Sequence, residues 1–273
     1  MAMVINTNMG SENAVRLLDQ TSREQKVSME RLTSGLRINK TADDAAGKAV
    51  VTRMDSQVRG TDMSVRNAQD GINLVQTMDG AVEEVVNMMQ RIRELGVQAA
   101  NDTYTDAQRE QMNEEVVQLR AEINRVASTT KFNGINLMNA DDSMSFHIGW
   151  ETGAVNQVKL STVDFTSAGN INQQLSITTQ SAALDAISKV DQGLSRINTI
   201  RAKWGAIQNR FESTISNLQN VNENIKSSRS QIQDADFARE SANLARTQVL
   251  QQAGMSMLSQ SNQQSQNVLS LLR

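Results

Sequence analysis

The stretch Val190–Ile232, VDQGLSRINTIRAKWGAIQNRFESTISNLQNVNENIKSSRSQI, decides the fold of this chain. Apolar residues occupy seven successive positions spaced seven apart: Val190, Ile197, Trp204, Phe211, Leu218, Ile225 and Ile232. This repeat is typical of a helix that buries one seam against other helices. The positions four residues further on are only partly apolar, which favours packing within the same chain over a two-stranded zipper. At about 1.5 Å per residue the seam would run roughly 60 Å.

The composition supports long, thin helical packing. The 273 residues include no proline, so no ring interrupts a long helix, and the aromatic residues are five Phe, two Trp and one Tyr. Leu, Ile, Val, Ala and fourteen Met must therefore fill most contacts. We predict a mainly α fold, an elongated antiparallel helical bundle or coiled-coil rod with one small β-hairpin region.

Charge and cysteine content argue against several classes of function. The 27 Lys and Arg are balanced by 30 Asp and Glu, so nucleic acid is not an expected partner. Cysteine is absent, so neither disulfides nor thiolate chemistry are expected. Residues 247–272 carry no charge but are rich in Gln, Ser and Asn, so membrane insertion is not expected. Residues 1–10 lack the pattern of an ordinary signal peptide.

Local signals place the other helices. A helix is expected over residues 5–36, and Thr41 is expected to cap a second helix that runs to about residue 100. Thr105 followed by Gln108 predicts a capping box that opens a third helix. Asp234 and Asp236 are expected to open a final helix.

The hairpin region is expected over residues 134–165. Asn133-Gly134 is a strong turn signal. The apolar period then changes to two at Met144, Phe146, Ile148 and Trp150, which predicts a strand, and a second strand is expected around Val158 and Leu160.

The two ends are amphipathic but short of bulky side chains. We expect residues 1–44 and 227–273 to form paired terminal helices that order on assembly, flanking a self-standing helical rod domain at 45–226.

No pattern of catalytic or metal-binding residues stands out. The single histidine, His147, is expected on the polar side of its strand, and metal sites need three or four converging ligands. Without cysteine and with one isolated histidine, nucleophilic catalysis has no support, and glycines form no phosphate-binding loop. We predict no enzyme activity, no metal and no cofactor.

Several motifs then resemble one family. ERLTSGLRIN at residues 30–39 and DDAAG at 43–47 closely resemble the amino-terminal signature of bacterial flagellins. QRIRELGVQAAN at 90–101 is similar to the family's inner-rod motif, and IQDADFA at 232–238 with VLSLLR at 268–273 to its carboxyl terminus. The short middle of the chain corresponds to a form without large outer-domain insertions.

The resemblance implies a structural subunit that polymerises into the propeller filament of the bacterial flagellum. It implies secretion through the flagellar type III apparatus to the extracellular flagellum, and the partners would be other copies of the chain, an export chaperone that clasps residues 232–273, and cap and junction proteins. A hook-filament junction protein and a soluble coiled-coil adaptor remain alternatives, which self-assembly would distinguish.

Two sets of candidate site residues result. The helical spacing of apolar residues at the two ends predicts a terminal assembly stripe of Leu18, Met29, Leu32, Leu36, Phe237, Leu244, Val249, Leu258 and Leu269. The resemblance implies recognition by an innate immune receptor, the flagellin-sensing Toll-like receptor, through Arg91, Leu95 and Glu115. The alternative for these three is packing between neighbouring subunits.

Overall fold

The structure is a computed structural model that describes residues 8–166 and 175–271, with side chains up to residue 263. The chain forms two compact units. Unit 1 comprises the described parts of Met1–Ser56 and Asn224–Arg273, and unit 2 is formed from Gln57–Glu223. The predicted mainly helical class is confirmed.

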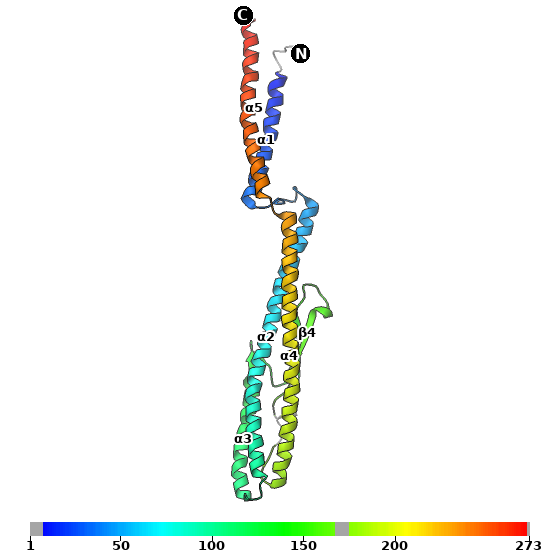
Figure 1. The fold of residues 1–273 in the computed structure, drawn as a ribbon, viewed down its shortest axis with the longest axis vertical. Coiled ribbons are helices and arrows are strands. Elements are labelled where there is room, and N and C mark those ends of the chain that lie inside the picture. The colour runs from blue at the N-terminus through cyan, green and yellow to red at the C-terminus, as the bar shows by residue number, and fades with distance from the viewer. Residues whose placement is uncertain (1–7, 167–174, 272–273) are drawn as a thin grey trace. The chain divides into compact units, whose positions relative to one another are not determined.

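Five long helices form most of the described part of the chain (Figure 1). They are α1 (Met9–Ser34), α2 (Ala45–Ala99), α3 (Asp106–Thr129), α4 (Gln180–Gln233) and α5 (Phe237–Leu271). The strands form two antiparallel pairs, β1 (Lys131–Phe132) with β2 (Ile135–Asn136), and β3 (Ser143–His147) with β4 (Gln157–Ser161), and a 3₁₀ turn, η1 (Ala154–Asn156), precedes β4. Unit 1 contains α1 and α5 with one end each of α2 and α4.

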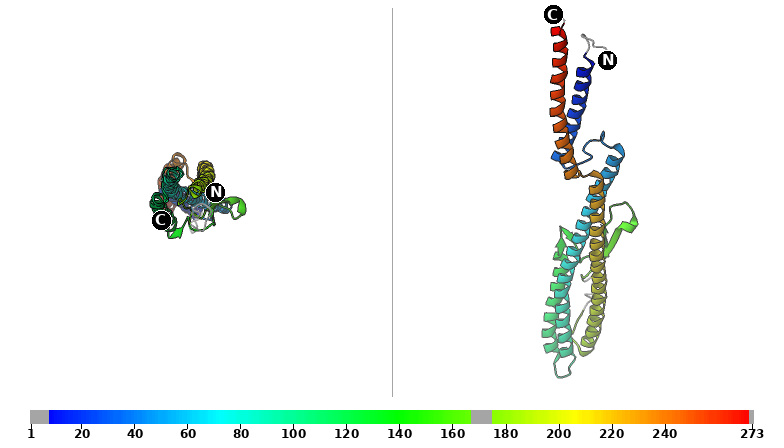
Figure 2. Two further views of the ribbon diagram at one scale, coloured as in Figure 1. Left: turned by 90° about the horizontal axis from the view of Figure 1, so that it is seen from below. Right: turned by 45° about the horizontal axis from the view of Figure 1, so that its top comes forward.

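In unit 2, α2 runs antiparallel to both α3 and α4 (Figures 1 and 2). Arg93 of α2 pairs with Asp191 of α4, whereas Asp79, earlier in α2, pairs with Arg201, later in α4. One large apolar core runs between the three helices and takes in Phe165, Leu175 and Ile177 from the connection to α4.

The α4 seam lies against this core in its first half. Val190, Ile197 and Phe211 have no exposed surface and Trp204 is 3% exposed, while Leu218, Ile225 and Ile232 are half-buried. The indole Nε1 of Trp204 donates a hydrogen bond to the Ser161 carbonyl at 3.1 Å, which ties α4 to β4. The seam thus fixes where the β3–β4 pair lies.

The corner between α2 and α3 is closed by polar contacts. The predicted capping box is present, since the Thr105 hydroxyl accepts from the Gln108 backbone and the Gln108 side chain accepts from the Thr105 backbone. Arg109 is buried, and its guanidinium donates to the carbonyls of Ala99 at 2.9 Å and Asn101 at 3.1 Å. The Ala99 carbonyl lies in the last turn of α2, where the helix itself supplies no N–H partner, so Arg109 of α3 ties the end of α2 to the start of α3.

The cap of α2 differs from the prediction. The helix begins at Ala45, and Asp44 Oδ1 accepts a hydrogen bond from the Gly47 N–H at 2.9 Å, whereas Thr41 lies in the preceding turn. Aspartate and threonine are both good caps, so sequence alone did not separate two candidates three residues apart. At α5 the prediction was partly right, because Asp236 Oδ1 accepts from the N–H groups of Ala238 and Arg239.

The strands also differ from the prediction. β3 ends at His147, before Ile148 and Trp150. The Ile148 N–H still donates to the Asn156 carbonyl at 2.8 Å, but the chain bends at Gly149 and Trp150, so the strand pairing stops there. The Asn133-Gly134 turn has positive φ at both residues, +49° and +80°, and it joins β1 to β2, a two-residue pair that the sequence analysis missed.

Candidate assembly surface and receptor site

α1 and α5 of unit 1 pack together as an antiparallel pair through a seam of mostly small and polar residues. On α1 the buried and half-buried positions that follow a heptad spacing are Ser11, Ala14, Leu18, Thr21, Gln25, Ser28 and Leu32. On α5 they are Glu240, Leu244, Thr247, Gln251, Gly254, Leu258 and Ser261. A Cβ on Gly254 would lie 2.8 Å from Leu18 Cδ2, so glycine allows the leucine to reach the α5 backbone.

A partly buried ion pair fixes one end of this seam. Arg31 Nη1 of α1 donates to Glu240 Oε1 of α5 at 3.0 Å, and the Glu240 side chain is 9% exposed. Burial alone would raise the pKa of Glu240, but hydrogen bonds from Arg31 and Ser28 and the positive charge of Arg31 lower it below its ordinary value on balance. The carboxylate is therefore held in its charged form.

Apart from the leucines in the seam, many large apolar side chains of this helix pair are exposed. The exposed apolar set of unit 1 is defined here as Met9, Val15, Leu17, Val27 and Met29 of α1 with Phe237, Val249, Leu250, Met255 and Met257 of α5. An ordinary bundle buries most of its large apolar side chains in its seam, so exposure of this many marks a candidate interaction surface.

The exposed apolar set surrounds the helices. Successive helical residues are about 100° apart, so Met255 and Met257 point in directions about 200° apart, as do Val27 and Met29. A single partner on one side would cover only part of the set. Covering it requires neighbours on several sides, as in an open polymer.

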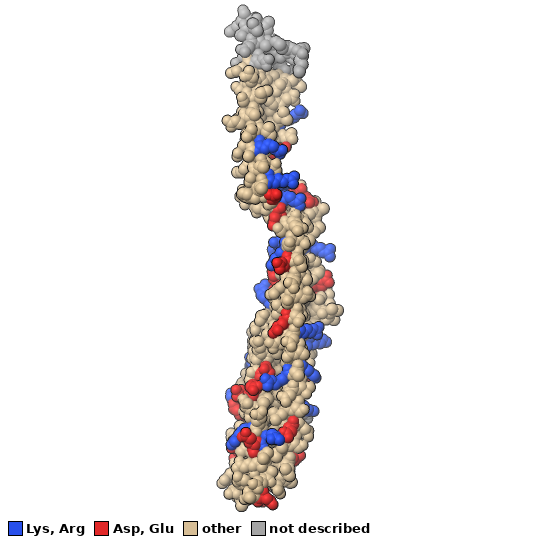
Figure 3. Space-filling view, viewed as in Figure 1, with Lys and Arg blue, Asp and Glu red and all other residues tan. Residues whose placement is uncertain are grey.

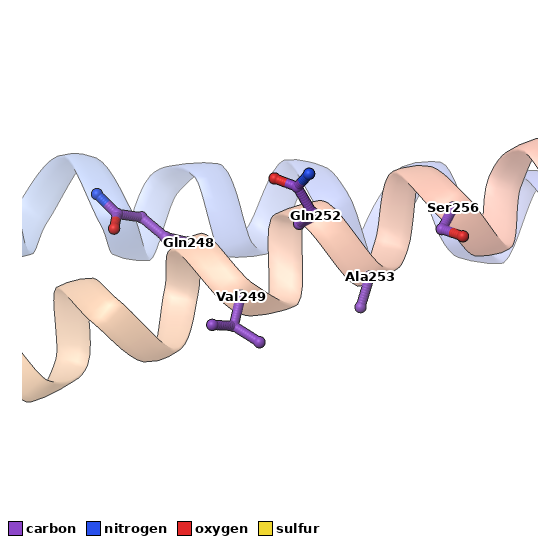
Figure 4. A pocket seen from close by; sticks show the side chains of 5 residues that line it. All are labelled: Gln248, Val249, Gln252, Ala253 and Ser256. Atoms are coloured by element: carbon purple, nitrogen blue, oxygen red, sulfur yellow. The ribbon is translucent and has the colours of Figure 1, made fainter.

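Figure 4 shows one part of this surface at close range. An open depression on α5 is lined by Gln248, Val249, Gln252, Ala253 and Ser256, and the Val249 and Ala253 side chains project on the same side of the helix.

On the face drawn in Figure 3, Lys and Arg alternate with Asp and Glu along unit 2, with no large region of one sign.

The structure divides the predicted terminal assembly stripe between two environments. Leu18, Leu32, Leu244 and Leu258 are half-buried in the α1–α5 seam, and Leu36 is half-buried beside its bridge with Asp234. Met29, Phe237 and Val249 are at least 50% exposed and belong to the outer surface. The side chain of Leu269 lies outside the described residues.

The structure brings together two of the three residues predicted for receptor recognition. Arg91 of α2 donates through Nε to Glu115 Oε1 of α3 at 2.8 Å and through Nη1 to Glu94 at 3.1 Å, and Arg91 and Glu115 are about half exposed. The hydrogen bond with Glu115 raises the pKa of Arg91, so the arginine stays charged. Leu95 is only 2% exposed, because it faces the core of unit 2 and not the surface that carries Arg91.

A second depression in unit 1 is polar and lies beside Arg37, Asp43 and Asp236. Its groups already have partners: Asp43 Oδ2 accepts from the Asn39 and Lys40 backbones, and Arg37 Nε donates to the Ile232 carbonyl at 3.1 Å. These bonds join the 35–44 loop to the junction of α4 and α5. The groups serve the local fold.

No other site chemistry stands out in the described part of the chain. Among those residues no three His, Asp or Glu side chains group as metal ligands would, and His147 is half-buried on β3. None of the described helices combines the length and apolar character needed to cross a membrane.

Comparisons with known proteins show which family the chain is similar to. The family model for the bacterial flagellin N-terminal helical region matches residues 5–142, and the model for the C-terminal helical region matches residues 187–272. Flagellin of Halalkalibacterium halodurans is 41% identical over 272 residues, which cover 99% of this chain and 100% of the relative. The flagellar filament 31.3 kDa core protein of Treponema maltophilum is 39% identical over 286 residues, covering 99% and 100%.

A solved structure supports the same grouping. The crystal structure of Bacillus cereus flagellin matches with a TM-score of 0.50 and 28% identity, covering 56% of this chain and 88% of that chain. Because both terminal family models match and the relatives align over the full length, this chain belongs to the bacterial flagellin family.

Proposed function

We propose that this chain polymerises through the exposed apolar set of unit 1, with residues 1–44 and 227–273 forming the inner core of the filament and 45–226 the outer part of each subunit. Membership of the family makes the chain a structural subunit of the extracellular bacterial flagellar filament and not an enzyme.

The exposure of large apolar side chains on α1 and α5 carries this proposal. Each large apolar side chain that moves from water into a contact contributes roughly 1.5–3 kcal/mol. Among the described side chains of α1 and α5, ten are 41–68% exposed, including Phe237 and Val249, so each can gain about half of that figure or more. Because they point in several directions around the helices, the contact that covers them continues from subunit to subunit and yields a helical polymer.

Seeded polymerisation of the purified chain, followed by electron microscopy, tests this. The intact chain should form long filaments, and removal of residues 233–273 should abolish them. Val249→Gln should raise the critical concentration while leaving the helical circular dichroism unchanged. Val155→Gln is the matched control, because Val155 is 92% exposed but lies in the 3₁₀ turn η1 of unit 2. Small discrete oligomers from the intact chain would contradict the proposal and favour an adaptor.

Before assembly the same surface must be kept from premature contact. We expect the chain to leave the cell through the flagellar type III apparatus, with an export chaperone that covers residues 232–273, and to assemble beside cap and junction proteins. The exposed Phe237, Val249 and Met257 on α5 support this, since they give a chaperone an apolar surface to bind. Chaperone binding that survives deletion of residues 232–273 in a pull-down assay would contradict it.

Arg91 and Glu115 support a second role, recognition by the flagellin-sensing Toll-like receptor. Their ion pair joins α2 to α3 and leaves both groups about half exposed. Leu95 would act indirectly, by anchoring this part of α2 to the core. Packing between subunits remains the alternative role for this surface.

A reporter-cell assay with monomeric protein separates these roles. Arg91→Ala should reduce the response. Arg93→Ala should not, because Arg93 has similar exposure but pairs with Asp191 of α4. An unchanged response to Arg91→Ala would exclude the receptor role.

A further inference from the structure

The exposed methionines of this chain concentrate on the helices that carry the assembly surface. Of the fourteen methionines in the sequence, five are exposed among the residues described. Four of these lie on α1 and α5, at least 50% exposed, and they are Met9, Met29, Met255 and Met257. The fifth is Met63, on the unit 2 part of α2.

Methionine adds a chemical property that leucine lacks. A peroxide transfers one oxygen atom to the thioether sulfur, so that the thioether and hydrogen peroxide become a sulfoxide and water. The sulfoxide is polar and costs free energy when it enters an apolar contact without a hydrogen-bond partner. Met78, Met89 and Met138 are buried in the core of unit 2, where the oxidant does not reach them in the folded chain.

We propose that the thioethers of Met9, Met29, Met255 and Met257 are oxidation sites through which peroxide blocks polymerisation of the free subunit. The inference rests on the proposed assembly surface. Methionine sulfoxide reductases reverse the block, since two thiols reduce the sulfoxide to the thioether and form a disulfide and water.

The positions of Met255 and Met257 on α5 explain why their oxidation would block polymerisation. Met255 and Met257 point in directions about 200° apart, so a neighbour on either side of α5 meets one of them. Each subunit of the filament repeats the same contacts, and one oxidised position therefore weakens every interface it enters. Once assembled, the same sulfurs are covered and react slowly.

The test compares oxidation of free subunits and of filaments by hydrogen peroxide. Peptide mass spectrometry should find sulfoxide at the four sites in free subunits before it appears at Met78, Met89 or Met138, and more slowly in filaments. Oxidised subunits should show a critical concentration raised by at least about tenfold. Treatment with the reductases should restore assembly.

Variants identify the responsible sulfurs. Met9, Met29, Met255 and Met257 all replaced by Leu should polymerise normally and keep doing so after peroxide, because leucine has a similar volume and no thioether. Met63→Leu should remain as sensitive as wild type. Unchanged assembly of oxidised wild type, or equal sensitivity of the four-site variant, would overturn the inference. Failure of untreated wild type to polymerise would instead refute the proposed function.

Discussion

At the scale of single residues, Phe211 shows how closely α4 and α2 approach. Its ring lies edge-on to Phe146 of β3, with centroids 5.8 Å apart and planes at 80°. Gly71 of α2 meets both rings: a Cβ on Gly71 would lie 2.8 Å from Phe211 Cε2 and Cζ and 3.5 Å from Phe146 Cδ1. A side chain at this α2 position would therefore displace the buried ring that links helix and hairpin.

We predict opposite effects for two glycine replacements on the same helix. Gly71→Ala gains about 1 kcal/mol of helix propensity but overpacks the Phe211 ring at a cost of about 1–3 kcal/mol, so unfolding in urea should occur at lower concentration. Gly80→Ala meets no atom within 4 Å and should stabilise the chain by about 0.5–1 kcal/mol. If both variants shift the urea midpoint of unfolding equally, the added methyl group at Gly71 does not destabilise the packing of Phe211.

At the scale of elements, the α1–α5 pair should depend on acidity through Glu240. The pKa of Glu240 is lower in the folded chain than its ordinary value of 4.5. Its contribution to stability is therefore complete above about pH 4.5 and is lost as the pH falls through the folded pKa. Arg31 then loses its charged partner.

Glu240→Gln should show this directly. The variant keeps an acceptor but not the charge, so α1–α5 pairing should weaken by about 1 kcal/mol at neutral pH and lose part of its acid dependence. Helical circular dichroism followed by pH titration measures both. Glu12→Gln, exposed in the first turn of α1, is the control. An acid transition that is the same in Glu240→Gln and wild type would exclude this role for the pair.

The helices with large apolar residues in their seams were predicted better from the sequence than those with small and polar residues there. The α4 heptads carry large apolar residues such as Ile197 and Phe211, and the sequence predicted that helix well. The α1–α5 heptads carry Ser28, Thr247 and Gly254, which a pattern of apolar residues does not include. The predicted stripe therefore combined leucines that face the seam with Met29 and Val249, which face outward. A search for a heptad of small residues would have found it. The β1–β2 pair was missed because two-residue strands are too short to show a period.

At the scale of the whole molecule, the two units differ in what holds each together. In the described part of unit 1 the buried apolar residues are Ile38 and Val51, and neither belongs to α1 or α5. Unit 2 buries an extended core that includes Val85, Ile92 and Ile197. The stability of unit 1 in a single chain therefore rests on polar contacts and half-buried leucines, and most of its apolar surface contributes only when other subunits cover it.

Hydrogen exchange should follow this difference. In monomers the amides of α1 and α5 should exchange at least about tenfold faster than those of residues 82–95 in α2, because local opening exposes little apolar surface. In filaments α1 and α5 should gain far more protection than α2. Limited proteolysis should agree, cutting the terminal helices of monomers first. Val249→Gln can be studied at a protein concentration at which wild type polymerises and the variant does not. Its α1 and α5 amides should then exchange as fast as in the monomer, whereas those of wild type are protected. Terminal helices as protected as α2 in a dilute monomer would mean that unit 1 is stable by itself, and that its apolar surface is not what couples folding of the ends to assembly.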